Sequence, residues 1–246
     1  MEQDVEVSIR RELHLLRIYA AVSIGIAALA LMGAATAVRS ASFDVLTVHR
    51  INVVDANGTL RLALFNKELQ PDVVVGGKTL KGRKGGKRAG LLFYNDRGDE
   101  QGGIAYTGDL VNGHAVQGGL LSFDQFRQND DLDLYFAQNG PDVETGLALS
   151  QNTLTPITAF IPAYEAMQKM PAGAARDRAM RKLRLAGLGP KTRLFAGLQN
   201  GNSRIALSDK LGRPRIVMEV AGDGSARLAF LDASGNVSAT FPPPAK

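Results

Sequence analysis

A nine-residue strand–turn unit occurs three times in this chain and limits what the chain can fold into. The copies align without gaps: Arg50–Gly58, Arg204–Gly212 and Arg227–Gly235. Each has apolar residues at its second and fourth places, Asp at its sixth and Gly at its ninth. Apolar residues two apart share one side of a strand. Asp can open a turn by accepting a backbone N–H, and Gly can take the positive φ of a bulged hairpin. The unit therefore predicts β-hairpins.

Looser relatives of this unit fill most of the remaining chain. Gly90–Gly98 is a weaker fourth copy, and 131–136 alternates so that Leu132, Leu134 and Phe136 are expected to point inward. The sequence predicts β-rich regions at 43–151 and 193–241, the latter ending in a four-stranded antiparallel meander over 203–241. The fold class is all-β, built from antiparallel hairpins and meanders in a sandwich, barrel or propeller. A β-solenoid is the alternative.

An apolar segment near the start, Ile18–Val38, predicts a transmembrane helix. It has 21 consecutive uncharged residues between Arg17 and Arg39. At about 1.5 Å per residue it could cross a hydrocarbon core of about 30 Å. Three Lys or Arg residues precede it and two follow soon after, which favours residues 1–17 as a cytoplasmic tail. The expected location is a bacterial inner membrane, crossed once, with the large domain outside. A cleavable signal peptide is the rival, with Ala35 and Ala37 at a candidate cleavage site.

Two segments interrupt the strands. Residues 67–89 are rich in Gly and Lys, so we expect a flexible basic loop there, with a short strand at 73–75. Residues 161–187 are expected to form a helical insertion, broken near Pro171 and capped by Gly187. Residues 242–246 are expected to be a disordered tail.

Charge is distributed unevenly and supplies the candidate binding residues. Ten acidic residues and one basic residue lie between Asp99 and Glu165, whereas Lys169–Arg193 has eight basic residues and one acidic. Residues of the first basic segment are candidates for binding an anionic surface or polymer: Lys78, Lys81, Arg83, Lys84, Lys87 and Arg88. Residues of the expected helix are candidates for docking on a partner or lipid: Arg176, Arg178, Arg181, Lys182 and Arg184.

The apolar segment together with RINVVDANGTLRLALFN and AGLLFYNDRGDEQGG resembles uncharacterised bacterial membrane-anchored proteins. Those proteins combine one N-terminal transmembrane helix with a β-rich domain. The resemblance implies a location and a fold, and it implies no activity.

Motifs for catalysis are missing from the sequence. Cysteine is absent, and the three histidines are far apart, so no metal site, cofactor or catalytic residue is predicted. Gly77-Lys78-Thr79 lacks the earlier Gly of a phosphate-binding loop. We expect a binding or scaffolding module for an envelope protein or polymer, anchored in the bilayer through 18–38. A homodimer could form through small residues of that helix, and the basic loop lacks the aromatics that usually bind nucleic acid. The alternative is a membrane-tethered hydrolase of envelope carbohydrate, with two carboxylates in a cleft.

Overall fold

The structure is a computed structural model that describes residues 2–35, 41–80 and 87–243. The chain divides into two units, Met1–Thr47 and Val48–Lys246. The first unit contains the helix α1, Glu2–Ala35, which includes the expected tail and most of the expected span. Within the described residues, no helix meets the length and apolarity needed to cross a bilayer. Residues 36–38 of the expected span lie outside the described part.

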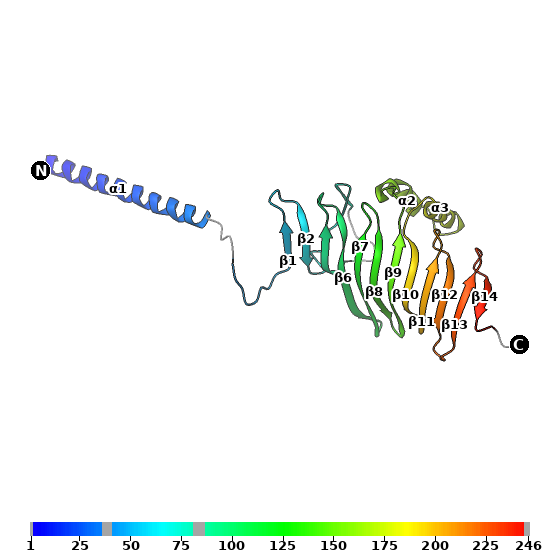
Figure 1. Cartoon of the computed structure of the whole chain (residues 1–246). Coiled ribbons are helices and arrows are strands. Elements are labelled where there is room, and N and C mark those ends of the chain that lie inside the picture. Colours follow the sequence, from blue (N-terminus) through cyan, green and yellow to red (C-terminus); the bar gives the residue numbers. More distant parts are fainter. Residues whose placement is uncertain (1, 36–40, 81–86, 244–246) are drawn as a thin grey trace. The chain divides into compact units, whose positions relative to one another are not determined.

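The second unit is dominated by one sheet of twelve antiparallel strands (Figure 1). Its strands follow one another in chain order, apart from one small hairpin. In sheet order they are β1 (Arg50–Val54), β2 (Leu60–Phe65), β5 (Ala89–Tyr94), β6 (Glu100–Val111), β7 (His114–Asp124), β8 (Asp130–Asn139), β9 (Asp142–Gln151), β10 (Lys191–Gln199), β11 (Asn202–Ser208), β12 (Pro214–Val220), β13 (Ala226–Leu231) and β14 (Val237–Phe241).

The all-β prediction is confirmed, whereas the sandwich, barrel and propeller expectations were wrong. The sheet is open, with β1 and β14 at its two edges. Every neighbouring pair is antiparallel, which also excludes the parallel β-solenoid for these strands. The meander over 203–241 is confirmed as β11 to β14. Hairpin turns specify only which strands are neighbours, so they could not decide whether the sheet closes on itself.

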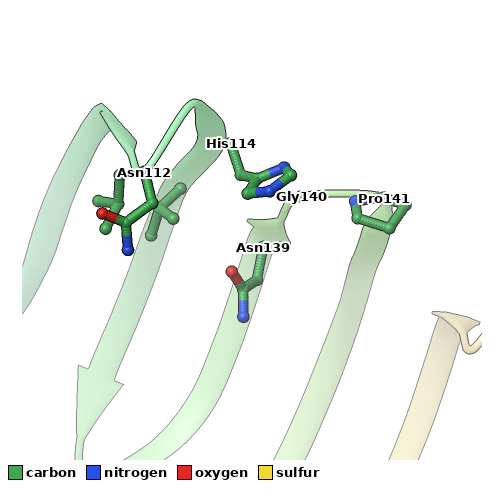
Figure 2. Close-up of a pocket in the computed structure, with 7 residues that line it drawn as sticks. Asn112, His114, Asn139, Gly140 and Pro141 are labelled. Atoms are coloured by element: carbon green, nitrogen blue, oxygen red, sulfur yellow. The ribbon is translucent and has the colours of Figure 1, made fainter.

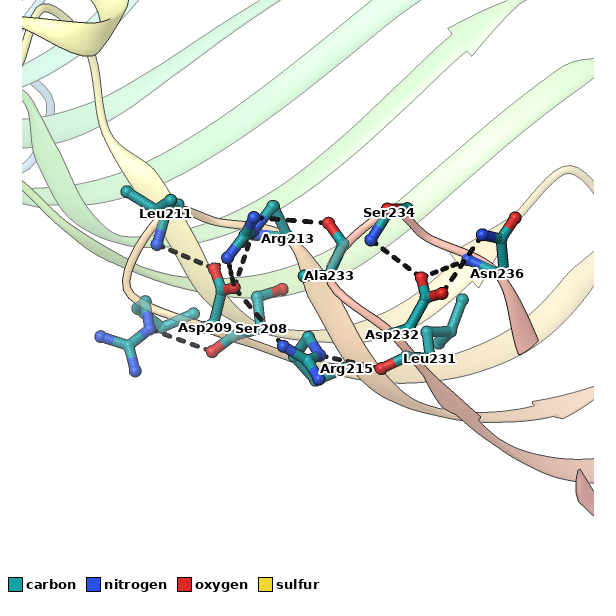
Figure 3. Close-up of polar contacts among 11 residues, drawn as sticks. Ser208, Asp209, Leu211, Arg213, Arg215, Leu231, Asp232, Ala233, Ser234 and Asn236 are labelled. Carbon is teal, nitrogen blue, oxygen red and sulfur yellow. Dashed lines mark hydrogen bonds and ion pairs between the residues drawn. The ribbon is translucent and has the colours of Figure 1, made fainter. Parts of the chain in front are cut away.

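The predicted turns form as the repeated unit requires. Asp209 accepts hydrogen bonds from the backbone N–H groups of Leu211 and Arg213, at 2.9 and 3.2 Å (Figure 3). Asp232 does the same for Ser234 and Asn236, at 2.8 and 2.9 Å. The glycine that ends each unit has a positive φ, 75° at Gly212 and 89° at Gly235. Such a φ carries little steric cost only for glycine.

The first interruption contains more structure than expected. β3 (Val73–Val75) confirms the short strand, and it pairs with β4 (Lys78–Leu80) in a two-stranded hairpin. The expectation of a loop at Lys78–Leu80 was therefore wrong. Gly76 and Gly77 form the tight turn with φ of 61° and 70°, a geometry that Gly-rich sequence permits as readily as it permits flexibility. Residues 81–86 lie outside the described part.

The helical insertion is confirmed as two short helices. They are α2 (Ile161–Gln168) and α3 (Ala174–Leu185), preceded by the 3-10 turn η1 (Ile157–Ala159). The helical segment is interrupted between them at Pro171–Gly173, as expected. Their apolar sides pack on each other, burying Phe160, Met167 and Leu183. The helices thus form a small core of their own at the ends of β9 and β10 (Figure 1).

Candidate functional site: an uncharged sheet face

The strand registers divide the apolar and charged residues of the sheet between its two faces. Residues opposite each other in an antiparallel ladder share a face, and successive residues alternate. We call one side the uncharged face. Its larger apolar residues are Ile51, Val53, Leu62, Leu64, Leu91, Phe93, Ile104, Tyr106, Leu110, Leu121, Phe123, Leu132, Leu134, Phe136, Val143, Leu147, Leu149, Leu194, Leu198, Ile205, Leu207, Ile216, Met218, Val220, Leu228, Phe230 and Phe241.

Charged strand residues lie on the opposite side, which we call the charged face. It includes Arg61, Asp133, Glu144, Arg204 and Glu219. Between the register shifts, no described paired residue on the uncharged face is Asp, Glu, Lys or Arg. Four charged residues, Glu100, Asp124, Asp130 and Lys191, lie at strand ends beyond such a shift. The separation therefore extends across all twelve strands.

Apolar side chains of the uncharged face are open to solvent within the second unit. The exposed fraction is 54% for Leu134, 59% for Tyr106 and 52% for Met218. The expectation that Leu134 points inward was wrong, because no second layer covers this face in the described part of the unit. A contiguous apolar surface larger than a few hundred Å² is unusual on a monomer and marks an interaction site.

The charged face contains the well-buried strand residues instead. Ala206, Val217 and Ala229 lie opposite one another on β11, β12 and β13, and each is at most 6% exposed. Ion pairs run along the adjacent row, where Glu219 lies 3.4 Å from Arg204 and 2.8 Å from Arg227. Small residues beside long paired side chains can be buried without a second layer, because the aliphatic stems cover them. This part of the charged face is suited to contact with water, whereas on β2 and β5 the same face carries the buried apolar cluster of Ala63, Phe65, Leu92 and Tyr94.

Two glycines lie beside aromatic rings of the sheet, at positions where any larger residue would clash with its neighbours. Phe93 and Phe123 stack on the uncharged face with ring centroids 5.6 Å apart, across Gly102 of the strand between them. A Cβ on Gly102 would lie 2.2 Å from the backbone oxygen of Ser122. On the charged face, a Cβ on Gly146 would lie 2.5 Å from the ring of Phe195. Aromatic rings lying beside or over glycine are a known way of stabilising glycine in a sheet.

An acidic cluster lies on the charged face near one end of β7 and β8. Burial raises the pKa of Asp124 to about 9, helped by its hydrogen bond with Asp130 and by the charge of Glu100. Burial also raises the pKa of Asp133 to about 6. One oxygen each of Asp124 and Asp133 is buried without a hydrogen-bond partner among the described residues. Within the described residues, however, no group of three His, Asp or Glu side chains is arranged to hold a metal ion.

A shallow hollow of about 280 Å³ lies where the β6–β7 and β8–β9 hairpins end (Figure 2). His114 is beside Gly140, and the lining also includes Val111, Val116 and Asn139. A second hollow, of about 320 Å³, contains Glu219 and Arg227, which already form an ion pair. Neither hollow brings two carboxylates together. The geometry expected of a carbohydrate hydrolase is therefore missing from both.

The candidate basic residues are only partly described. Lys78 is exposed on β4, Lys87 donates to the backbone oxygen of Glu68 at 2.7 Å, and Arg88 is half-buried. Lys81, Arg83 and Lys84 lie outside the described residues. On α3, Arg176 donates to Gln168 at 2.8 Å. The other helix residues of the set are exposed, and no described carboxylate forms an ion pair with them: Arg178, Arg181, Lys182 and Arg184. The two basic sets belong to different elements, and nothing described joins them into one site.

Comparisons with protein-family models, with curated proteins and with solved structures find no match to this chain. The candidate site therefore rests on the geometry of the uncharged face. The sequence did not identify the residues of this face as a binding surface, because the apolar alternation in each strand predicted that they would be buried in a core. No signal in the sequence could have found them, because twelve apolar strand sides can also cover one another in two stacked layers.

Proposed function

We propose that this protein is a membrane-tethered binding or scaffolding module that docks its partner on the uncharged face. The observation that carries the proposal is that exposed apolar side chains lie on that face in eleven of the twelve strands, all except β5. A sheet with one apolar face is stable and soluble only when another layer covers that face. The function of the module is then to bind the partner that covers the uncharged face.

The tether is the apolar half of α1 with the residues that follow it. Its support is the uninterrupted uncharged run from Ile18 to Val38 between two arginines. Side chains of this run are exposed within their own unit, 72% for Tyr19 and 69% for Ile24. The bias of Arg and Lys favours residues 1–17 in the cytoplasm and the sheet outside it.

A binding role fits the site better than a catalytic one. Hydrolysis of a glycosidic bond needs two carboxylates flanking a cleft. Asp124 and Asp133 line neither hollow, and neither hollow contains two carboxylates. The hydrolase alternative thus has less support than the docking surface.

Two neighbouring residues of β6 provide a matched test. Tyr106 lies on the uncharged face and Thr107 on the charged face, and both are exposed. In membranes solubilised gently and run on a native gel, we expect the wild-type chain in a complex well above its 26.2 kDa. Tyr106→Glu should abolish that complex because it buries an unpaired charge, whereas Thr107→Glu should preserve it. A complex that both variants retain equally would reject the uncharged face as the docking site.

A further inference from the structure

We propose that the layer covering the uncharged face is a second copy of this chain, packed face to face as a two-layer β-sandwich. This inference rests on the proposed function, since it names the partner of the same surface. We infer that the covering layer is a second copy from three observations: the area of the face, its lack of charged residues, and the hydrogen bonds that its polar side chains already form.

The size of the face matches what a stable dimer needs. Twelve strands at about 4.8 Å spacing give a width of about 55 Å, and six residues per strand give a length of about 20 Å. Each copy would then bury about 1,100 Å², or about 2,200 Å² for the pair. That total exceeds a standard interface and falls in the range of permanent homodimers, whose interfaces are also the more apolar ones.

The lack of charge favours a partner with the same composition. Any Lys, Arg, Asp or Glu that a partner placed against this face would lose its water without gaining an opposite charge. A second copy supplies an equally wide uncharged surface, and a two-fold axis makes such a contact self-complementary. Aromatic and Met side chains are enriched in protein interfaces, and Tyr106, Phe136 and Met218 provide them on this face.

Two glutamines on this face already form hydrogen bonds within the chain, so they could be buried away from water at little cost. Gln117 and Gln138 lie opposite each other on β7 and β8, and Gln117 donates to the oxygen of Gln138 at 2.7 Å. Gln138 in turn donates to the backbone oxygen of Gly140 at 3.0 Å. Buried polar groups cost little once they are hydrogen-bonded within the chain. An anionic lipid surface would instead favour cations bordering the apolar side chains, and this face has none between the register shifts.

The test uses single cysteines, because the chain has none of its own. β8 and β9 are the sixth and seventh of the twelve strands, so a two-fold sandwich stacks them near its axis. Leu134→Cys places a thiol there on the uncharged face. Ala137→Cys places an exposed thiol on the charged face of the same strand. Each full-length variant is oxidised in native membranes with copper phenanthroline so that facing thiols form a disulfide, and non-reducing denaturing gels then separate 26.2 kDa monomers from covalent dimers. Leu149→Cys on β9 is a second uncharged-face position.

We expect Leu134→Cys and Leu149→Cys to form covalent dimers several-fold more than Ala137→Cys. Dimers at equal yield from both faces would reflect random collision and overturn the proposal. Thiols at 134 and 149 that resist maleimide in membranes without joining each other would also overturn it. That second result would leave a docking surface filled by another protein or by lipid. Free labelling at 134 and 149 would reject the second copy and the proposed function together.

Discussion

Asp99 accepts a hydrogen bond from the backbone N–H of Gly77 at 2.8 Å, which joins the β3–β4 turn to the sheet. The carboxylate is 1% exposed, and its other oxygen lies 3.7 Å from Nε of Arg127. Arg127 has φ of 56°, and its backbone oxygen accepts the N–H of Ile157 at 2.9 Å. One buried carboxylate thus connects the small hairpin, the start of β6 and the segment that leads into the helices.

Removing that carboxylate should destabilise the second unit. Asp99→Ala leaves the Gly77 N–H without its hydrogen-bond acceptor and the Arg127 guanidinium without its ion-pair partner. We expect a loss of about 2–3 kcal/mol in the free energy of unfolding, measured by urea titration. Asp96→Ala is the control, because Asp96 is 94% exposed and its pair with Arg61 should contribute at most about 0.5–1 kcal/mol. Equal losses for the two variants would contradict the connecting role of Asp99.

A glycine of β10 should not tolerate a methyl group. A Cβ on Gly197 would lie 2.0 Å from the backbone oxygen of Thr145 on the neighbouring strand. Gly197→Ala should therefore force β9 and β10 apart and cost at least about 2 kcal/mol of unfolding free energy. Gly119 of β7 has nothing within 4 Å of its Cβ position. Gly119→Ala should be nearly neutral, and thermal unfolding of both variants tests the contrast.

Asp124 should make stability depend on pH. Its pKa is raised in the fold from 3.8 to about 9, so folding favours the protonated carboxyl. The stability that the protonated Asp124 carboxyl contributes is fully present below about pH 4, and it is lost as the pH rises toward about 9. Asp124→Asn removes this dependence, so the variant should gain urea resistance over the wild-type chain at pH 8.5 and gain less at pH 5. Asp142→Asn, on the same face, is the control. A gain that is the same at both pH values would contradict this assignment.

The pKa of Asp209 is shifted in the opposite direction from that of Asp124, so its effect on stability should have the opposite dependence on pH. Hydrogen bonds from Arg213, at 2.7–2.8 Å, lower its pKa from 3.8 to about 2 (Figure 3). Its contribution to stability is therefore present above about pH 4 and lost as the pH falls through about 2. In Arg213→Gln, NMR titration of the carboxyl carbon should show the midpoint moving back toward 3.8. Arg178→Gln on α3 should leave the midpoint unchanged, and an unmoved midpoint in Arg213→Gln would show that the backbone donors alone lower it.

Local structure could be predicted from the sequence to a considerable extent. Turns at Asp209 and Asp232 were predictable because the Asp side chain and the Gly φ are local requirements. The break at Pro171–Gly173 between α2 and α3 was predictable for the same reason. The β3–β4 turn was not, because Gly76-Gly77 in a basic, Gly-rich stretch indicates mobility as readily as a hairpin.

The candidate site depended on information that no local pattern contains. Alternation along β8 shows that Leu134 and Asp133 lie on opposite faces, and it leaves open whether a second layer covers Leu134. Twelve strands could equally have folded into two stacked layers. Only the complete set of registers shows that the apolar sides of the twelve strands of the large sheet align on one face.

A thiol-accessibility scan along β6 tests most directly whether the uncharged face is covered in the native protein. Single cysteines from Ile104 to Val111 are labelled with a water-soluble maleimide in the cell fraction that contains the native protein and again after denaturation. The even positions lie on the uncharged face and the odd positions on the charged face. We expect protection that alternates with a period of two, with positions 104, 106, 108 and 110 protected. Uniform labelling of all eight positions would show that the face is bare and would contradict its role as an interface.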